Sequence, residues 1–502
     1  MPDYEPVIGL EIHVQLKTQS KLFCASPNVG SDPKAGGGLT PNVNICEICT
    51  GQPGTLPRLN VEALKKAILV GLALNCEIAE STKFDRKNYF YPDLPKGYQI
   101  SQFDRPINGR GHLKIGDRTI GITRAHLEED AGKLLHELPS RSDLDDPKMS
   151  YVDLNRAGVP LLEIVTEPDF RSPEEAGKFL RVLRSIVRYL GVSDADMEKG
   201  HLRVDANISL RPKGQTELPP YKVEVKNMNS FKAVEAALNY EIKRQAEAQD
   251  SKQELFDETR GFVDATRVTV SQRTKEAAHD YRYFPEPDLP VIQIGKELIE
   301  ELRHSMPELP TAKAERFASE YDGLSDNDIV QLVDDKDLAN YFENIASELG
   351  AWSEAEGMTE EQTKKALKAA VKWLLGDFMA LLNRTNEGIA DAKITAENFA
   401  ELIKMIEKGE ISVTAGKTIL SEMYSTGADP SEITERLNLG QVSDTSAIEQ
   451  AVDKVITENP DVVEKYKSGK TSVVGVLVGQ VIKEMGGKAN PKVVNEILKQ
   501  RL

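Results

Sequence analysis

Residues 7–16 read VIGLEIHVQL, and this stretch decides the fold class of the first part of the chain. Apolar side chains stand at every second position from Leu10 to Leu16, and polar ones, including Glu11 and His13, stand between them. A period of two predicts a β-strand with one face in a core. The pattern recurs in LRVDANISL at 202–210 and in VEVK at 223–226. Such one-sided burial indicates an antiparallel or mixed sheet rather than a doubly wound parallel sheet.

The periodicity changes along the chain and divides it into three parts. Strands prevail up to about residue 292, with helices expected at 61–75 and 173–190, and prolines at 285, 287 and 290 close this part. Beyond it, amphipathic helices are expected at 296–304, 360–383 and 396–408. We therefore predict an α+β protein with a sheet domain at 1–292, an all-α domain at 293–410 and an all-α tail at 411–502.

Bulk properties restrict the compartment and the partners. The 502-residue chain contains four cysteines and begins MPDYEP, without the basic start and apolar core of a secretory signal. No apolar run reaches the length that spans a membrane, so we expect a cytoplasmic protein without membrane contact. The net charge of −17 disfavours nucleic acid, but from Glu464 onward eight basic residues outnumber three acidic ones. That segment is either a contact for a phosphate backbone or an ordinary solvated helical surface.

Two Gly-Lys-Thr triplets, at 416–418 and 469–471, do not form P-loops. A Walker A loop carries another glycine five positions before the glycine of the triplet, where the backbone approaches phosphate closely. Ile411 and Glu464 occupy those positions. If the protein uses ATP, it binds the nucleotide without a P-loop.

Three cysteines are spaced like metal ligands. Cys24 precedes a Cys46-x-x-Cys49 pair, which together look like a zinc knuckle. A closed zinc site needs four ligands, and Ser26 stands where the missing thiolate would suit. The remaining Cys76 ends an apolar helical stretch and is expected in the core. Zinc binding by Cys24, Cys46 and Cys49 therefore stays open.

The strongest local signal for chemistry is acidic. The run HLEED at 126–130 places three carboxylates beside a histidine. Alone, it would be a solvated loop or the acid-rich first turn of a helix. However, Asp, Asn and His, which are poor strand formers, recur on polar strand faces at 13, 153, 155, 205 and 207. Because carboxylates favour Mg²⁺, which bridges phosphates, the pattern predicts a Mg²⁺-nucleotide or phosphoryl-transfer site built by strands.

Two aromatic clusters allow two interpretations. Residues 89–91 read YFY and follow Arg86 and Lys87, and residues 281–284 read YRYF. Such rings stack on an exposed base or ribose in some proteins, and in others they are core anchors at sheet edges. The second interpretation is favoured.

Several long motifs resemble the B-subunit family of the tRNA-dependent amidotransferases. They are VIGLEIHVQL at 7–16, KFDRKNYFYPD at 83–93, HLEEDAGK at 126–133, YVDLNR at 151–156, RVDANIS at 203–209 and DYRYFPEPD at 280–288. The resemblance runs essentially from end to end, and the helical C-terminus is similar to the small YqeY-like proteins. The related archaeal E type has an extra domain after the sheet domain, whereas here Pro290 leads directly into helices, which favours the B type.

The resemblance implies a fold and a reaction. The fold is a catalytic cradle domain, a helical domain and a YqeY-like tail that contacts tRNA. The family acts as a ligase on Glu-tRNA(Gln) or Asp-tRNA(Asn): ATP phosphorylates the side-chain carboxylate, and ammonia then displaces the phosphate. The ammonia comes from glutamine, which is hydrolysed in the amidase (A) subunit, and the small (C) subunit makes the assembly a heterotrimer. This chain has no Gly-Ser-Ser run of the amidase type, in agreement with that division of labour.

The resemblance also implies site residues. It assigns the Mg²⁺ site to His13 and Glu129, with Glu11 and Glu128 as close candidates, and leaves open whether His13 contacts a phosphate oxygen instead. Weaker candidates for the pocket wall or the ammonia exit are Asp205, Asn207, Glu224 and Lys226. Some members of the family carry a four-thiolate zinc site, from which this chain departs by one ligand.

Two functions follow as alternatives. The first is a catalytic protein that uses ATP and Mg²⁺ on aminoacyl-tRNA. The second is a tRNA-binding scaffold whose partner houses the phosphorylation chemistry. The sequence does not distinguish Glu-tRNA(Gln) from Asp-tRNA(Asn) as the substrate.

Overall fold

The computed structural model describes residues 4–28, 40–135, 149–274, 281–385, 387–441, 445–468, 473–486 and 489–502. Asp280, Lys470, Lys488 and the second Gly-Lys-Thr triplet, which the sequence patterns include, lie outside these ranges. The chain forms two compact units, Met1–Thr311 and Ala312–Leu502. Within the described ranges, no helix has the length and apolar character needed to cross a bilayer.

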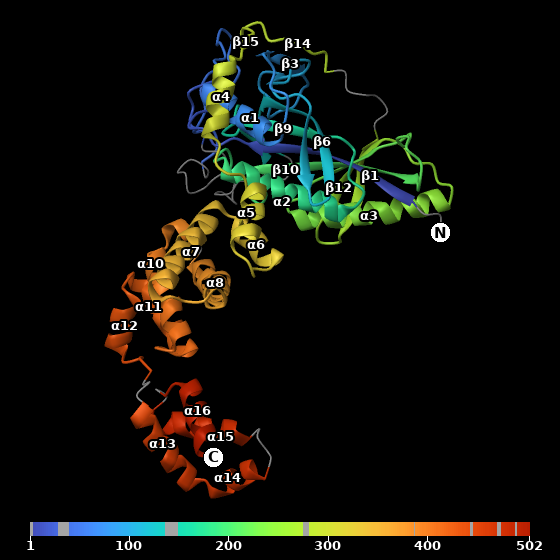
Figure 1. Ribbon diagram of the computed structural model, residues 1–502. Helices are drawn as coiled ribbons and strands as arrows, with labels where there is room; N and C mark the ends of the chain where they lie inside the picture. The colour runs from blue at the N-terminus through green and yellow to red at the C-terminus, as the bar shows by residue number, and fades with distance from the viewer. Residues whose placement is uncertain are drawn as a thin grey trace. The chain divides into compact units, whose positions relative to one another are not determined.

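The first unit is built on a large mixed sheet, which the described residues form from eleven strands (Figure 1). In spatial order ten of them are β13 (Val268–Thr274), β12 (Glu258–Val263), β11 (Val223–Lys226), β10 (Leu202–Pro212), β1 (Tyr4–Gln15), β9 (Pro160–Thr166), β6 (Arg118–Glu129), β4 (Tyr98–Ser101), β3 (Asp85–Asn88) and β14 (Phe284–Pro285). The eleventh, β5 (Gly111–Ile115), pairs with β6 beside this row. The pair β11–β12 is parallel and the other pairs are antiparallel.

Two short ribbons accompany the large sheet. One joins β2 (Ser81–Thr82) to β15 (Ile292–Gln293), and the other joins β7 (Lys133–Leu135) to β8 (Tyr151–Asp153). Both pairs are antiparallel, as is common for neighbouring short strands.

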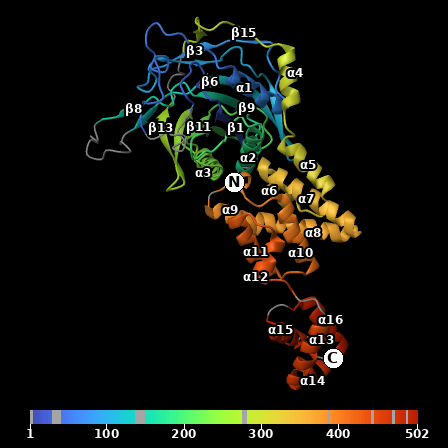
Figure 2. The same ribbon diagram turned by 90° about the vertical axis from the view of Figure 1, so that its left-hand side faces the viewer.

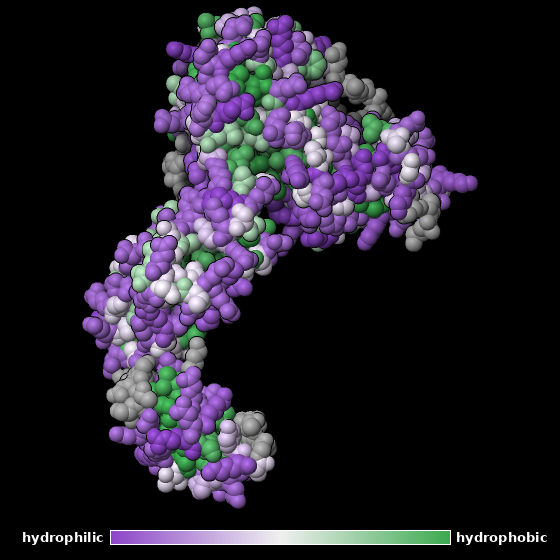
Figure 3. All heavy atoms as spheres, in the orientation of Figure 1, coloured by the Kyte–Doolittle hydropathy of each residue, from purple (hydrophilic) through white to green (hydrophobic). Residues whose placement is uncertain are grey.

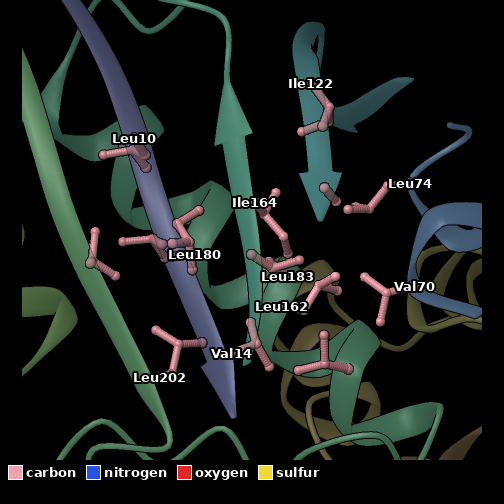
Figure 4. Packing of buried hydrophobic residues seen from close by; sticks show 14 of the residues in the cluster. Leu10, Val14, Val70, Leu74, Ile122, Leu162, Ile164, Leu180, Leu183 and Leu202 are labelled. Atoms are coloured by element: carbon pink, nitrogen blue, oxygen red, sulfur yellow. The ribbon is translucent and has the colours of Figure 1, made fainter. Parts of the chain in front are cut away.

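The apolar face of β1 lies in the main core, as its alternation predicts. Three helices supply the other side of this core: α1 (Val61–Ala73), α2 (Pro173–Tyr189) and α3 (Phe231–Asp250). Figure 4 shows Leu180 and Leu183 of α2 and Val70 of α1 among the strand residues Leu10 and Leu162. The opposite, polar face of these strands is therefore left for other uses.

Local sequence signals explain where these helices begin. Before α2, the Ser172 hydroxyl accepts a hydrogen bond from the Glu175 N–H at 3.2 Å, and Pro173 fits the first turn because no partner is needed for its nitrogen. Asn60 and Ser230 cap α1 and α3 in the same way. A further helix, α4 (Lys296–Ser305), packs beside α1 and lies near it in Figures 1 and 2.

The described residues of the second unit form helices joined by turns and loops, and the first of these helices begins just before the unit boundary. Its elements are α5 (Pro310–Glu320), α6 (Asp326–Val333), α7 (Lys336–Glu356), α8 (Glu360–Trp373), the π-helical turn η2 (Leu374–Phe378), α9 (Met379–Thr385), the 3₁₀ turn η3 (Ile389–Asp391), α10 (Ala396–Lys408), α11 (Val413–Thr426), α12 (Pro430–Leu437), α13 (Thr445–Glu458), α14 (Pro460–Lys467), α15 (Val474–Glu484) and α16 (Pro491–Arg501). One apolar core runs from Phe317 to Ile433, and a separate one runs from Ile448 to Leu498.

The fold class expected from the sequence, α+β with a mixed sheet followed by helices, is confirmed. The compact units do not divide where the expected domains do. The first unit extends past residue 292 to Thr311, because Ile294 and Leu302 of the α4 region belong to the core of the sheet. The division expected near residue 410 falls inside the core that ends at Ile433, because α11 and α12 pack against α10. The glycine of the first Gly-Lys-Thr triplet, Gly416, lies inside α11, which agrees with the absence of a P-loop there.

Charged and polar residues cover most of the face seen in Figure 3, with apolar residues in smaller patches between them. Such a surface is ordinary for a protein in water. On this face, particular side-chain arrangements are therefore better candidates for a functional site than a large apolar patch.

Candidate active site

The polar face of the large sheet carries a row of charged side chains across four neighbouring strands. In the strand register, His13 on β1 lies opposite Arg203 on β10 and opposite Glu163 on β9. Glu163 in turn lies opposite His126 on β6. Side chains at paired positions project to the same face of a sheet, so these four residues from distant parts of the sequence stand side by side.

This row forms part of the floor of a polar cavity of about 680 Å³. The cavity wall includes Lys87 and Tyr89, which flank the end of β3, and Tyr281 and Tyr283, which precede β14. A cavity of this volume is in the range that holds small ligands and nucleotides.

Two overlapping groups of side chains at the floor have the composition of a cation site. Glu11, His13 and Glu163 offer one ligand atom each within 4.8 Å of one another, and so do His126, Glu128 and Glu163. His13 Nε2 lies 3.5 Å from Glu128 Oε1, 3.6 Å from Glu163 Oε2 and 3.8 Å from Glu11 Oε1. His126 Nε2 lies 3.5 Å from Glu163 Oε2, so Glu163 is common to both groups. Carboxylate oxygens are the ligands that Mg²⁺ prefers, and the three carboxylates fit it.

The two histidines of this floor differ in protonation. Burial disfavours a charged ring at His13, but its hydrogen bond with Glu163 and the negative charges of Glu128, Glu163 and Glu11 together raise the pKa of His13 to about 9. At His126, burial together with the positive Arg124 and Lys87 lowers the pKa to about 4. His126 Nδ1 is also buried without a hydrogen-bond partner among the described residues. His13 is therefore a cation in the ligand-free chain, whereas His126 keeps a neutral ring with an unused nitrogen.

The carboxylates also differ. Burial and the neighbouring Glu163 charge raise the pKa of Glu128 to about 6. Burial opposes ionisation of Glu163 as well, but His126, His13 and Lys87 around it hold the pKa of Glu163 well below its usual range. Although burial disfavours its ammonium group, the charges of Glu128 and Glu163 raise the pKa of Lys87 above its usual value. The floor thus combines a carboxylate with a lowered pKa, a carboxylate with a raised pKa and a lysine with a raised pKa.

Glu129, a main candidate from the sequence, lies away from this group. It directly follows Glu128 on β6, and successive side chains of a strand point to opposite faces. Its carboxylate forms an ion pair with Lys96 and accepts a hydrogen bond from the Ile100 N–H at 2.9 Å. The structure therefore brings Glu128, rather than Glu129, to His13.

The weaker candidates divide between two places on the same face. Asp205 lies opposite Glu11 in the register of β10 and β1, and Lys226 Nζ lies 2.6 Å from Asp205 and 3.1 Å from Glu224. These three residues line the polar cavity. Asn207 instead lines a smaller cavity of about 260 Å³ farther along β1 and β10.

Two other polar residues named from the sequence, Asp153 and Asn155, bind the backbone of a loop instead of facing the cavity. Asp153 Oδ1 accepts a hydrogen bond from the Asn42 N–H at 3.1 Å, and Asn155 Oδ1 accepts from the Val43 and Asn44 N–H groups at 2.9 Å. Their polarity serves backbone groups that would otherwise lack partners.

Sequence reasoning missed Glu163 and Lys87. Glu163 stands in PLLEIVT at 160–166, a strand with both faces largely buried, so no alternation exposes its role. The available signal was a single carboxylate inside an otherwise apolar strand, since a buried charge needs a partner or a function. Lys87 belongs to the motif KFDRKNYFYPD at 83–93, but nothing in the sequence distinguishes its role from that of the neighbouring Arg86.

The three cysteines meet, as their spacing suggests. Cys49 Sγ lies 3.5 Å from Cys24 Sγ, 3.7 Å from Cys46 Sγ and 3.5 Å from Ser26 Oγ. The fully buried Lys21 places its Nζ 3.4 Å from Cys49 Sγ, and the hydrogen bond from Cys24, with Ser26 and Lys21, lowers the pKa of Cys49 to about 4. The cluster thus offers three of the four ligands of a closed zinc site and already contains a buried cation beside a thiolate, so it does not fit such a site well.

Comparisons with known proteins identify the family of the chain. The GatB/GatE catalytic domain matches residues 6–300, and the GatB domain matches residues 356–502. The chain is 47% identical to the B subunit of the aspartyl/glutamyl-tRNA(Asn/Gln) amidotransferase of Carboxydothermus hydrogenoformans, over 100% of this chain and 99% of that protein. It is 48% identical to the corresponding protein of Persephonella marina over the full length of both chains, and 46% identical to that of Rippkaea orientalis over 99% of this chain and 98% of the relative. The chain therefore belongs to the GatB family, the B subunits of the aspartyl/glutamyl-tRNA(Asn/Gln) amidotransferases.

Proposed function

We propose that this chain is the subunit that activates and amidates the side-chain carboxylate of misacylated Glu-tRNA(Gln), Asp-tRNA(Asn) or both, with ATP and Mg²⁺. The observation that carries the proposal is the group of Glu11, Glu128 and Glu163 with two histidines at the floor of a polar cavity. Three buried or half-buried carboxylates on one sheet face are unfavourable for folding alone, and a ligand with positive charge explains them.

The carboxylates Glu128 and Glu163, together with the more exposed Glu11, would hold Mg²⁺. Imidazole is an unusual ligand of Mg²⁺, so His13 is assigned to a phosphate oxygen rather than to the metal. When bound, Mg²⁺ neutralises negative charge on the phosphoryl group during its transfer. Glu129 is not among the proposed ligands, because its carboxylate is occupied by Lys96 and by the Ile100 N–H.

The chemistry needs activation because oxide is too poor a leaving group for direct amidation of a carboxylate. The substrate carboxylate attacks the terminal phosphorus of ATP and releases ADP, which gives an acyl phosphate. Ammonia then attacks the acyl carbon, and phosphate leaves with the electron pair of the broken C–O bond. In this cavity, Lys87 and His13 are the cations that would hold the phosphoryl oxygens and the substrate carboxylate in place.

The partners follow from this division of the reaction. Ammonia would come from glutamine hydrolysed by the amidase (A) subunit, and the small (C) subunit would make the assembly a heterotrimer in the cytoplasm. Asp205, Glu224 and Lys226 form the wall of the cavity on the β11 side, where ammonia would enter. The helices built around the separate core from Ile448 to Leu498 would contact tRNA through the basic residues on their surface.

The decisive experiment bypasses the amidase. The assembled complex receives ammonium chloride, ATP, Mg²⁺ and either Glu-tRNA(Gln) or Asp-tRNA(Asn), and formation of Gln-tRNA or Asn-tRNA is measured. We expect His13→Ala to abolish product formation while glutaminase activity with glutamine persists. If folded His13→Ala complex forms product at the wild-type rate, the chain is a tRNA-binding scaffold, and the phosphorylation chemistry lies in a partner.

The tail is tested separately. Deletion of residues 445–502 removes one self-contained core and leaves the core that ends at Ile433 intact. We expect weaker tRNA binding with a smaller salt dependence, and unchanged glutaminase activity. Unchanged tRNA affinity at moderate salt would exclude the tail as a contact.

A further inference from the structure

The three clustered cysteines are reactive side chains that the proposed function does not use. Cys49 Sγ lies 3.5 Å from Cys24 Sγ and 3.7 Å from Cys46 Sγ, and the three sulfurs lie within 4.8 Å of one another. Because Ser26 stands beside Cys49 where a closed zinc site would need a fourth thiolate, zinc does not account for the cluster. Thiols at such distances can also be joined by oxidation to a disulfide.

A buried lysine favours the reactive form of Cys49. The Lys21 side chain is fully buried, and its Nζ lies 3.4 Å from Cys49 Sγ and donates a hydrogen bond to the Asn44 carbonyl at 2.8 Å. A buried ammonium group needs a negatively charged partner, which Cys49 supplies as a thiolate. The thiolate is the form of cysteine that reacts with hydroperoxides. Cys24 and Cys46 are half-buried, so small molecules reach the cluster.

The loop that carries Cys49 is fastened to the segment before β9. Asn155 Oδ1 accepts a hydrogen bond from the Asn44 N–H at 2.9 Å. The next residue, Arg156, lines the polar cavity, and its Nε lies 3.4 Å from Asp130 Oδ2 in the same wall. A displacement of the loop would therefore be transmitted to this wall.

The loop also packs closely against Lys96. Gly51 has a φ of 67°, and a Cβ atom at this position would lie 2.7 Å from Lys96 Cγ. Lys96 forms an ion pair with Glu129, which directly follows Glu128 on β6. The loop thus contacts two segments that adjoin the polar cavity.

We propose that Cys24 and Cys49 form an oxidation site, which hydroperoxides convert reversibly into a disulfide, and that this disulfide slows amidation. The effect on amidation rests on the proposed function. Cys24 is assigned as the partner because its sulfur lies nearer to Cys49 than the sulfur of Cys46 does.

The reaction has two steps. The Cys49 thiolate attacks an oxygen of the hydroperoxide, the O–O bond breaks, and hydroxide or alkoxide leaves with its electron pair, which gives a sulfenic acid on Cys49. The Cys24 sulfur then attacks the Cys49 sulfur, an S–S bond forms, and the hydroxyl group leaves as water with the proton of Cys24. The hydroperoxide gains the two electrons that the sulfurs lose. A dithiol reverses the change by thiol–disulfide exchange.

Formation of the bond requires the loop to move. An S–S bond is about 2.05 Å long, so the two sulfurs must approach by about 1.5 Å from their separation of 3.5 Å. A displacement of about 1 Å within a site can lower a rate by up to about 10²-fold. Because the loop lies one step from the cavity wall, we expect amidation to slow by about tenfold.

The test treats the assembled complex with hydrogen peroxide, blocks the remaining thiols with N-ethylmaleimide and maps the disulfides of this chain by mass spectrometry. Ammonia-dependent amidation is measured before oxidation, after it and after addition of dithiothreitol. Cys24→Ser and Cys49→Ser each remove one sulfur of the pair, and Cys46→Ser removes the third sulfur. The matched control is Cys76→Ala, because Cys76 is a buried cysteine of the main core and is not part of the cluster.

We expect a Cys24–Cys49 disulfide in the wild-type, Cys46→Ser and Cys76→Ala complexes, with loss of two of the four free thiols of the wild-type chain. Their amidation should slow by about tenfold and recover with dithiothreitol. The Cys24→Ser and Cys49→Ser complexes should keep their rates in peroxide. Absence of the disulfide, a Cys46–Cys49 disulfide in its place, or the same loss of rate in Cys24→Ser overturns the proposal.

Failure of the proposed function leaves a different signature. If the reduced wild-type complex does not amidate with ammonia, disulfide mapping still tests the oxidation site. If the disulfide forms and the amidation rate does not change, the link from the loop to the cavity is wrong. One equivalent of zinc bound by this chain in the reduced complex would also contradict the proposal, because the sulfurs would then be metal ligands.

Discussion

The large sheet carries two clusters of buried charge at different strands, and they are built in opposite ways. Around Glu241 on α3, the side chains of Arg244 and Arg260 form ion pairs at 2.8 and 3.1 Å, and Gln245 Nε2 donates at 2.9 Å. Glu258 on β12 completes this cluster with both arginines at 3.1 to 3.4 Å. Around Glu163 on β9, by contrast, the contacts from the histidines and Arg124 are 3.5 to 3.7 Å long.

The difference is the one expected between a structural cluster and the ligand site proposed above. The Glu241 cluster balances two carboxylates with two guanidinium groups, and its atoms are used in short, directed hydrogen bonds. The Glu163 cluster crowds three carboxylates and leaves His126 Nδ1 without a partner among the described residues. In a cluster that stabilises the fold, the polar atoms have hydrogen-bond partners within the protein. In a cluster that binds a ligand, some polar atoms lack such partners until the ligand is bound. Substitutions should therefore affect stability at one cluster and activity at the other.

The largest effect is expected from Glu163→Gln. This change removes the carboxylate that both candidate cation groups share, so ammonia-dependent amidation should fall by about 10²–10³-fold or more. The melting temperature should fall only slightly. The lost contacts from the two histidines and Arg124 are 3.5 to 3.7 Å long, and the change also relieves repulsion from Glu128 and Glu11. Product formation and thermal unfolding are measured on the same preparation. A variant that unfolds at lower temperature and keeps its activity would reverse the roles assigned to the two clusters.

Glu241→Gln should do the opposite. It removes one of the two buried carboxylates that pair with Arg244 and Arg260 and leaves them only Glu258, and breaking a buried ion pair typically destabilises a protein by about 3–5 kcal/mol. The free energy of unfolding from denaturant titration should fall by this order, while kcat per folded molecule is retained. Lost activity with unchanged stability would show that the short contacts around Glu241 do not hold the sheet.

The neighbours Glu128 and Glu129 refine the comparison within one strand. Glu128→Gln should lower the amidation rate by about tenfold or more with little change in stability, because Glu128 faces His13 in the cavity. Glu129→Gln should lower stability, because it weakens the pair with Lys96. Both rates and both melting temperatures are needed. Greater loss of rate in Glu129→Gln would restore Glu129 as the residue that serves the reaction.

A smaller effect is expected from pH at the structural cluster. Burial opposes ionisation of Glu241, but hydrogen bonds from Arg244, Thr269 and Gln245 lower the pKa of Glu241 below 4.5. A depressed pKa contributes stability that is present above the unfolded pKa and is lost as pH falls through the folded value. The difference in melting temperature between wild type and Glu241→Gln should therefore be constant near neutrality and shrink below about pH 4.5. A constant difference down to acid pH would contradict this assignment.

The smallest effect concerns the cysteines, where Lys21 supplies the cation that a metal would otherwise provide. Purified protein should retain well under one equivalent of zinc, because Cys24, Cys46 and Cys49 lack a fourth thiolate. Elemental analysis measures this, with Ser26→Cys as the variant expected to gain zinc. One equivalent in the wild type would show that Ser26 or a solvent molecule completes the site.

Much of the candidate site could be predicted from strand periodicity. Alternation placed Glu11 and His13 on one face and Asp205 on the same kind of face, and the register brings Glu11 and Asp205 opposite each other. The distinction between Glu128 and Glu129 depends on where β6 begins its alternation, and a bulge between Ile122 and Arg124 disturbs it. Periodicity in one segment therefore does not decide which of two adjacent carboxylates enters the cavity.

Other parts depend on contacts between distant segments. Glu163 gains its role from the pairing of β9 with both β1 and β6, which no local pattern specifies. The rings of Phe103 and Tyr283 stack with their centroids 4.0 Å apart although 180 positions separate them, and the sequence, from which packing was favoured for the 281–284 cluster, does not predict this pairing. The first compact unit extends beyond residue 292 for a similar reason, because Ile294 and Leu302 pack in the core of the sheet.

The row of Arg203, His13, Glu163 and His126 also limits how genes of this family can change length. Deleting one residue of β9 before Glu163 would shift the remainder by one position, turning Glu163 toward the core and a leucine or isoleucine toward the cavity. One deletion would thus bury a charge and remove the proposed ligand site together. Insertions and deletions should accumulate in the connecting loops, while the strands of this row vary by substitution alone.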